Sequence, residues 1–322
     1  MKYFYIARLN GLKIEGKLNR GIQVVDNLRI SNNKDRIEKK CDDFFKHLVG
    51  KLEYDHLFEG SYVYAEGDYE FDKHNDEAKR MDLLNYFLKV SQVVSSCLWL
   101  IKDNSISTEQ GFLYIYGNEF IKKSVSSNGR TNNFLNATGN RVETLYTLDE
   151  LKQGLDINQK QFNSKDMARL DNAAAADMVT NKATRLERFN NFLDTARTEI
   201  YVPNKISTYC TALETLLSTD NQEIGHKIAE RLARLLGKDS TERIEIFNFI
   251  KLAYGIRSAN VHGDKLPKKF RDLNAQYEVS IKLDNYIRKF FTLVLENEEL
   301  ITLYEGDNKE DLNMYYRELI FT

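Results

Sequence analysis

The spacing of hydrophobic residues changes once along this chain, and that change constrains the fold more than any other feature of the sequence. In residues 1–75, short apolar and aromatic runs are separated by Gly, Asn and Asp, a pattern typical of β-strands. After about residue 160, apolar residues recur every three or four positions, as in amphipathic helices. We therefore predict an α+β protein, with a β-rich N-terminal domain over residues 1–160 and an all-α antiparallel helical bundle with a C-terminal tail over residues 161–322.

The predicted N-terminal domain contains strands, turns and two helical segments. Strands are expected at residues 3–9, 21–30, 61–71, 111–117 and 141–147. One helical stripe lies within residues 37–49, and a long helix covers about residues 76–102. Trp99, between two leucines of this helix, is expected in the core. The Ser- and Asn-rich segment 124–140 is predicted to be an exposed loop.

Five helices with short connections are predicted in the C-terminal half, which favours antiparallel packing. The first is one long helix over residues 164–200. Pro203 suits the first turn of the second helix. The third covers about residues 222–236, the fourth begins near Ser240 or Thr241 as its cap, and the fifth covers about residues 274–297.

Composition limits the compartment and the chemistry. The 322 residues carry a formal net charge of −2, so any contact with nucleic acid requires a local basic patch. The three cysteines form no C-x-x-C pair, which favours a reducing compartment over a disulfide framework or a zinc site. No run has the length of a membrane span, and the sequence has no glycine-rich phosphate loop, G-x-S-x-G or H-E-x-x-H motif. We expect a cytoplasmic protein with no membrane attachment, metal or cofactor.

The end of the fourth predicted helix carries the most specific chemical signal. Residues 244–254 are apolar on nearly every face, which indicates burial in a bundle core or under a partner, yet Arg257 and His262 follow directly. Residues five apart on a helix diverge by roughly 140°. Because Gly263 is a common type of helix stop, a helix that ends near Val261 would let His262 turn back toward Arg257.

Two interpretations of this segment stay open. Tyr254, Arg257 and Asn260 share one face by their spacing, so their polar groups could converge with His262 on one small site. Alternatively, a cation near a helix C-terminus complements the helix dipole, and a His before Gly is an ordinary stop signal.

Basic residues are concentrated around this segment in an otherwise slightly acidic chain. Some share one face of the third helix and others directly follow the Arg–His segment. The residues expected to contact a nucleic-acid phosphate backbone are Lys227, Arg231, Arg234, Lys265, Lys268 and Lys269. A solvated face with local ion pairs is the alternative explanation.

The order of these motifs resembles the HEPN superfamily, and within it the ApeA-like branch. An A-L-E-x-L-L helix, here Ala212 to Leu217, precedes an Arg-rich helix and then Y-x-x-R-S-x-x-x-H-G, here Tyr254 to Gly263. The resemblance covers about residues 165–300. It implies a metal-independent endoribonuclease, usually a homodimer in which both Arg–His pairs face a shared cleft.

Carried over by position, Arg257 and His262 match the catalytic pair of that family. The family often has Asn, Asp or His directly after the Arg, where this chain has Ser258, so Asn260 could take the supporting role. The residues expected to support the pair are Asn260, Ser258, Tyr254 and Glu214. In the implied reaction, neutral His262 takes the proton of the RNA 2′-hydroxyl, Arg257 holds the phosphate, and the product is a 2′,3′-cyclic phosphate.

The resemblance leaves other functions open. The same bundle without catalysis would be an RNA-, nucleotide- or partner-binding module, and a dimerisation scaffold is a weaker third possibility. We expect the N-terminal domain to recognise a protein or phage-derived trigger. A regulated toxin, or an effector of antiviral defence by abortive infection, is implied by analogy with the family.

Overall fold

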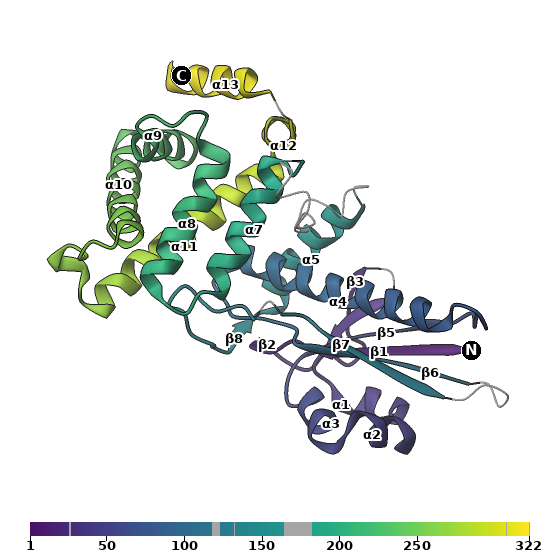
Figure 1. Ribbon diagram of the computed structural model, residues 1–322. Coiled ribbons are helices and arrows are strands. Elements are labelled where there is room, and N and C mark those ends of the chain that lie inside the picture. Colours follow the sequence, from purple (N-terminus) through teal and green to yellow (C-terminus); the bar gives the residue numbers. More distant parts are fainter. Residues whose placement is uncertain (26, 118–122, 132, 164–181, 307, 322) are drawn as a thin grey trace. The chain divides into compact units, whose positions relative to one another are not determined.

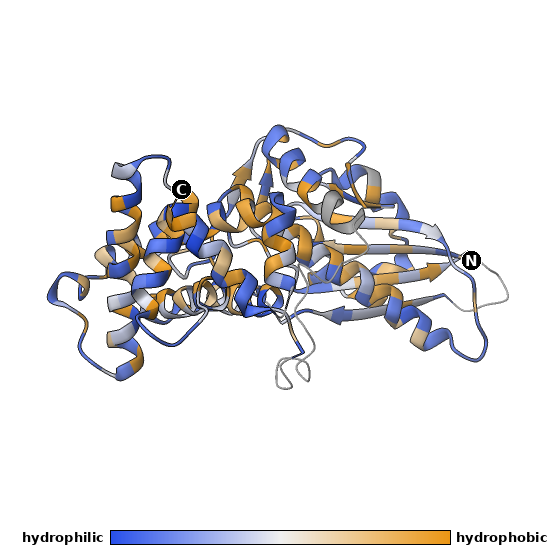
Figure 2. Cartoon of the chain, turned by 90° about the horizontal axis from the view of Figure 1, so that it is seen from above, coloured by the Kyte–Doolittle hydropathy of each residue, from blue (hydrophilic) through white to orange (hydrophobic). Residues whose placement is uncertain are grey.

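The computed structural model of the chain describes residues 1–25, 27–117, 123–131, 133–163, 182–306 and 308–321 (Figure 1). It confirms the predicted α+β class, because an antiparallel sheet with helices precedes a region of helices. The chain divides into two compact units. One is formed by Met1–Phe134 with Arg141–Lys165, and the other by Leu135–Asn140 with Asp166–Thr322. Hydrophobic residues concentrate on strands and helices, and the connecting loops are mostly hydrophilic (Figure 2).

Six of the described strands form one antiparallel sheet in the order β3-β4-β5-β1-β6-β7. Their bounds are β1 (Lys2–Arg8), β3 (Ile22–Val25), β4 (Leu28–Ser31), β5 (Tyr62–Asp68), β6 (Gln110–Tyr116) and β7 (Ser124–Gly129). In the centre, Tyr5 of β1 lies opposite Ala65 of β5 and Leu113 of β6. Because side chains alternate along a strand, Tyr5 enters one core and Phe4 and Ile6 enter the other. Burial on both faces explains the continuous apolar run of β1.

Helix α4 (Asp76–Ile101) covers one face of this sheet (Figure 1). Leu84, Phe87 and Leu98 pack with Tyr5 in the core on that side, and Trp99 is buried as predicted. By length and composition alone, α4 is apolar enough to cross a membrane, but 67% of its most apolar window is buried inside the structure. Such burial is typical of a core helix in a soluble protein.

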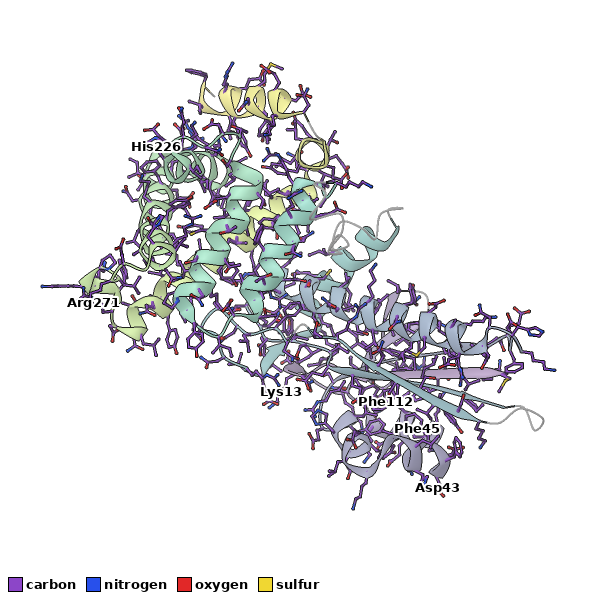
Figure 3. The ribbon with its side chains drawn as sticks, viewed as in Figure 1. Lys13, Asp43, Phe45, Phe112, His226 and Arg271 are labelled. Carbon is purple, nitrogen blue, oxygen red and sulfur yellow. The ribbon has the colours of Figure 1, made fainter. Side chains whose placement is uncertain are left out.

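Short helices cover the opposite face of the sheet. They are α1 (Lys34–Ile37), the 3-10 turn η1 (Glu38–Lys40), α2 (Asp43–Val49) and α3 (Lys51–Leu57). Phe45 of α2 and Phe112 of β6 belong to the core on this side (Figure 3). The single helical stripe predicted within residues 37–49 is interrupted, because Asp42 caps a new helix by accepting the Phe45 amide at 2.9 Å.

The predicted exposed loop over residues 124–140 is wrong in two places. Residues 124–129 form β7, which pairs with β6, and Phe134, Leu135 and Ala137 are buried. A Ser-rich strand at a sheet edge needs only backbone hydrogen bonds, so it leaves little hydrophobic signal in the sequence. The strand predicted over residues 141–147 shortens to β8 (Thr144–Tyr146), which pairs in parallel with β2 (Leu12–Ile14) and precedes α5 (Leu148–Asn163).

Residues 135–140 belong to the helical unit rather than to the sheet. The Leu135 amide donates to the Arg197 carbonyl at 2.7 Å, and the Ser280 hydroxyl donates to the Ala137 carbonyl at 2.5 Å. Gly139 takes a positive φ of 75° where the loop packs against Ile200. The chain therefore passes from one unit to the other more than once, and not only near residue 160.

The helical unit has the bounds α7 (Arg185–Thr198), α8 (Val202–Leu217), α9 (Ile224–Leu236), α10 (Ser240–His262), η3 (Lys268–Phe270), α11 (Leu273–Glu296), α12 (Glu298–Glu305) and α13 (Lys309–Phe321). One long helix over residues 164–200 is wrong, because residues 182–184 are not helical and Thr184 begins α7 with a capping box to Glu187. Residues 164–181 of that prediction lie outside the described part of the chain. The expected C-terminal tail is helical.

A buried arginine fixes these last two helices to the bundle. The Arg231 side chain is 8% exposed, donates to the Leu217 carbonyl and lies over the Tyr316 ring at 4.2 Å. The Tyr316 hydroxyl donates to the Leu216 carbonyl at 3.1 Å and lies 2.9 Å from the Tyr304 hydroxyl. α8, α9, α12 and α13 thus meet at one cation–π contact and a chain of hydroxyl groups.

Replacing Tyr316 with Phe removes only the hydroxyl, so we expect the free energy of unfolding to fall by about 1–2 kcal/mol. Urea denaturation of the full chain measures this change. Tyr315→Phe on the same helix is the matched control and is expected to change stability by less than about 0.5 kcal/mol. Equal effects of the two variants would contradict the proposed role of the Tyr316 hydroxyl.

Candidate functional site

Helix α10 carries the predicted Arg–His site, and Asp239 caps its N-terminus. The carboxylate of Asp239 accepts the amide of Glu242 at 2.9 Å. Ser240 and Thr241, the predicted caps, are instead the first residues of the helix. Asp caps a helix as effectively as Ser or Thr, which explains the difference of one residue.

The C-terminus of α10 has the ending typical of a glycine stop. Gly263 takes the left-handed conformation with φ 74°, and the Asp264 amide donates to the Ala259 carbonyl at 2.8 Å. The predicted stop is confirmed. However, the helix continues through His262, so the predicted end near Val261 is wrong by one residue.

The uninterrupted helix keeps Arg257 and His262 apart. Over five residues the direction of the side chains rotates by roughly 140° and the axis advances by about 7.5 Å. Arg257 is half-buried against α8, whereas His262 is exposed and makes no hydrogen bond or ion pair with the described residues. Within a single chain, the expected turn of His262 back toward Arg257 is therefore wrong, because residue 262 is still helical.

Arg257 is positioned by Glu214 and Tyr254, two residues that the sequence predicts to support it. Its Nη2 lies 3.2 Å from Oε1 of Glu214, and its guanidinium lies 5.3 Å from the centre of the Tyr254 ring. The Tyr254 hydroxyl donates to the same Glu214 oxygen at 2.6 Å. Burial raises the pKa of the Tyr254 hydroxyl and this hydrogen bond raises it further, so Tyr254 stays a neutral donor. Arg257 Nε is buried and has no hydrogen-bond partner among the described residues.

Asn260 joins the last turn of α10 to the first turns of α8. Its amide nitrogen lies 3.1 Å from both Asn204 Oδ1 and Ser207 Oγ. The prediction that Tyr254, Arg257 and Asn260 share one face is thus confirmed, and that face lies against α8. Asn204 and Ser207 were not identified from the sequence, because nothing local to α8 indicates which helix lies opposite them.

Ser258, the residue directly after Arg257, is half-buried and makes no hydrogen bond with the described residues. Asn260 is the residue that bonds α8. Ser258 therefore has no visible supporting role in the structure. Asn260 holds α10 against α8 and does not position Arg257.

A buried cysteine lies beside the Arg–Glu pair. Burial raises the pKa of the Cys210 thiol to about 12, with the Glu214 carboxylate adding to the rise and Arg257 opposing it. Cys41 and Cys97 are also buried free thiols, and burial raises their pKa values to about 12. Thiols with such pKa values are protonated at neutral pH, which disfavours a role as nucleophile or metal ligand.

The predicted phosphate-binding residues separate into different environments. Lys227 pairs with Asp220 at 2.6 Å, and Arg231 is buried under Tyr316, so it is not available to RNA. Arg234 lines a groove near the start of α10. The exposed residues after the Arg–His segment are Lys265, Lys268 and Lys269. These three follow His262 closely in the chain, and their contact with a phosphate backbone stays a prediction.

Helix α10 is not buried on every side in the single chain. Ile246, Ile250, Ala253 and Ile256 form its buried stripe, but Ile244 is 62% exposed and Val261 56% exposed. Gly255 is exposed, and a side chain built there would meet nothing within 4 Å. Helix α10 therefore has more apolar residues than the rest of this chain covers.

No group of three or more potential metal ligands occurs among the described residues. Comparison of the chain with protein-family models, curated proteins and solved structures gave no match. The residues themselves therefore carry any argument about function.

Glu214→Ala is expected to reduce the free energy of unfolding by about 1–3 kcal/mol, because it leaves the Tyr254 hydroxyl and the Arg257 guanidinium without their shared acceptor. Urea denaturation gives the change. Glu245→Ala is the control, because Glu245 pairs with Lys282 on the surface and such pairs contribute roughly 0–1 kcal/mol. An effect no larger than that of the control would show that Glu214 does not hold α8 and α10 together.

Proposed function

We propose that this chain is a metal-independent endoribonuclease of the kind implied by its resemblance to the HEPN superfamily. The observation that carries the proposal is the guanidinium of Arg257, held by Glu214 and Tyr254 one and a half turns before an exposed His262. A planar guanidinium can bind two phosphate oxygens at once, and histidine is the side chain most often used as a general base. RNA is the substrate because it supplies its own nucleophile.

The proposed reaction uses the RNA 2′-hydroxyl. His262 removes its proton, the 2′-oxygen attacks the adjacent phosphorus, and the bond from phosphorus to the 5′-oxygen of the next nucleotide breaks. The departing oxygen takes a proton from water. Arg257 stabilises the charge that develops on the phosphate oxygens. The products are a 2′,3′-cyclic phosphate and a 5′-hydroxyl, and DNA, which lacks the nucleophile, is not cut.

We propose further that the active form is a homodimer through the exposed side of α10. In one chain, Arg257 and His262 point in directions roughly 140° apart, so a second copy is needed to bring an Arg and a His to one phosphate. Gly255 supports this, because glycine within a helix costs about 1 kcal/mol relative to Ala and nothing in the single chain requires its small size. A second helix that packs closely against α10 would require the small size of glycine at this position.

The alternative is a binding module that does not cut. The single observation in its favour is that Arg257 is already paired with Glu214, while His262 makes no hydrogen bond or ion pair with the described residues. In either case, we propose a cytoplasmic protein whose sheet unit recognises a protein or phage-derived trigger, in a toxin or an antiviral defence system. This last part rests on analogy with the family.

Purified protein is expected to cut single-stranded RNA in EDTA and to leave a 2′,3′-cyclic phosphate, which mapping of the product ends detects. His262→Ala is expected to reduce the rate at least about a hundredfold, as loss of a general base does. Because His262 is exposed, its loss is expected to cost less than about 1 kcal/mol of stability. Arg257→Gln should also abolish cleavage.

His226→Ala is the matched control for this experiment, since His226 is an exposed histidine on α9. It should keep the wild-type rate, and thermal melts of all variants test whether they are folded. Cleavage that depends entirely on added Mg²⁺ or Mn²⁺ would overturn the mechanism. A folded His262→Ala protein that cuts at the wild-type rate would place the active site elsewhere.

The full chain is expected to be a dimer at micromolar concentration by light scattering, and Gly255→Glu should convert it to a monomer by placing a charged side chain in the contact. Met314→Glu on α13 is the control, because Met314 is 56% exposed and lies on another helix. A wild-type monomer, or a Gly255→Glu dimer, would contradict the proposed interface.

A further inference from the structure

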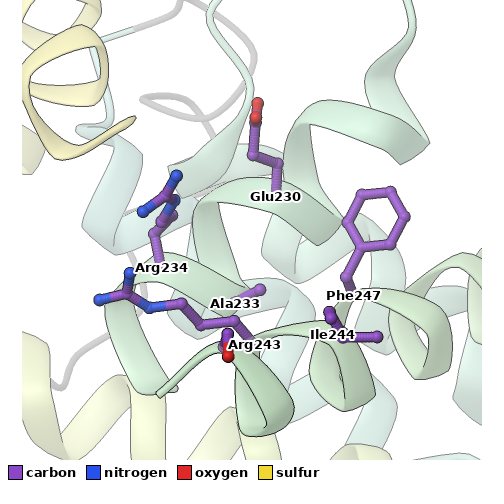
Figure 4. A pocket seen from close by; sticks show the side chains of 7 residues that line it. Glu230, Ala233, Arg234, Arg243, Ile244 and Phe247 are labelled. Carbon is purple, nitrogen blue, oxygen red and sulfur yellow. The ribbon is translucent and has the colours of Figure 1, made fainter. Parts of the chain in front are cut away.

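A groove separate from the Arg–His site opens between the end of α9 and the start of α10 (Figure 4). Its volume is about 320 Å³, at the lower end of the range for small-molecule sites, which is roughly 300–1,000 Å³. The residues that line it are Glu230, Ala233, Arg234, Ser240, Arg243, Ile244 and Phe247. Both helices and the turn at Gly237 belong to one antiparallel hairpin, so the groove is part of the fold of the helical unit.

Two guanidinium groups lie together on one side of this groove. In the view of Figure 4, Arg234 and Arg243 extend on the same side of the groove, and the carboxylate of Glu230 is directed away from them. Arg234 makes no hydrogen bond or ion pair with the described residues, and Arg243 uses Nε to donate to the Gly237 carbonyl at 3.1 Å. Two cations side by side repel each other, and an anion bound between them would relieve that repulsion.

Two acidic residues near the start of α10, Asp239 and Glu242, accept hydrogen bonds from backbone amides. Asp239 accepts the amide of Glu242 at 2.9 Å, and the Glu242 carboxylate accepts the amide of Lys238 at 2.8 Å. Neither forms an ion pair with Arg234 or Arg243 among the described residues. Apart from Arg243 Nε, the donors of the two guanidinium groups therefore remain available to a ligand.

The rest of the groove is apolar. Ala233 contributes a methyl group, Ile244 is 62% exposed, and Phe247 is half-buried. The ring of His226 lies against Phe247 in an edge-on arrangement, with 5.1 Å between the ring centres. An exposed apolar floor next to two cations fits a ligand that is planar and apolar at one end and anionic at the other.

We propose that this groove binds a nucleoside monophosphate. Arg234 and Arg243 hold the phosphate by charge-assisted hydrogen bonds, and the base lies over Phe247 and Ile244. Glu230 accepts hydrogen bonds from N–H groups of the base or from ribose hydroxyls. Inorganic phosphate would use only the two arginines, so the apolar floor favours the whole nucleotide.

This groove is distinct from the Arg–His site. Arg243 and Arg257 are 14 residues apart on one helix, which places them about 21 Å apart along its axis. Helix α9 lies over the intervening part of α10, because a side chain at Gly225 would come within 2.7 Å of the Tyr254 ring. A nucleotide in the groove therefore does not reach Arg257, and the proposal does not depend on ribonuclease activity.

The test is isothermal titration of the full-length His262→Ala protein with AMP and with GMP. At least one should bind, and the double variant Arg234→Gln with Arg243→Gln should weaken that binding at least tenfold. Arg271→Gln is the matched control and should leave binding unchanged, because Arg271 projects from the loop beyond the other end of α10 (Figure 3). Phe247→Leu should weaken nucleotide binding and leave the weak binding of inorganic phosphate unchanged.

Three results would overturn the proposal. One is the absence of binding by either nucleotide to the folded protein, and another is equal binding by the double arginine variant. The third is that a short single-stranded RNA binds at this groove, with dependence on both arginines, while the mononucleotides do not; the groove would then be part of an RNA path. Because His262→Ala is used throughout, none of these results bears on the proposed cleavage reaction.

Discussion

The carboxylate of Glu214 joins the two helices on which the candidate site depends. It accepts the Tyr254 hydroxyl and pairs with Arg257, and both of these residues lie on one face of α10. A turn further along, Asn260 makes the second polar contact with α8. A helix is rigid over this length, so these contacts set its rotation about its own axis. Gly255 and His262 then face away from α8 and are exposed.

The same carboxylate has two effects on Arg257. It orients the guanidinium, and it also neutralises part of the charge that a phosphate would use. The contact of 3.2 Å involves Nη2, and Nε has no partner among the described residues. A guanidinium has five N–H donors, so binding a phosphate does not require Glu214 to leave. Glu214 therefore positions Arg257 without using all of its donors.

Helix α8 is joined by polar contacts to α11 as well. On the side of α11, the Tyr209 hydroxyl donates to buried Asp284 at 2.8 Å, and Arg288 lies 3.3 Å from the same carboxylate. Buried ionic contacts add little net stability, but breaking one is costly because it leaves a charge without its partner. They penalise other rotations and registers of these helices. We regard α8 as the element that orients both α10 and α11.

The local sequence pattern predicted much of the fold correctly. It failed where contacts with another strand or helix decide the structure. The long helix α4, helices α9 and α11, and the stop at Gly263 follow from periodicity and capping residues. Strand β7 has a Ser-rich sequence and becomes a strand because β6 offers it a backbone edge. The break before α7 was also missed, because apolar spacing continues across residues 182–184 while Thr184 starts a new helix.

By itself the sequence determined the α+β class, the order of the main helices and the placement of Tyr254, Arg257 and Asn260 on one helical face. These features depend on the period of a helix or a strand, which is a local property. Only the tertiary structure decided what that face meets, and hence that Arg257 pairs with Glu214 while His262 stays exposed. It also decided that Arg231 is buried under Tyr316 whereas Arg234, three residues later, lines an open groove. The two arginines differ little in local sequence. Arg231 is buried and Arg234 is not, because α13, which is distant in the chain, covers only Arg231.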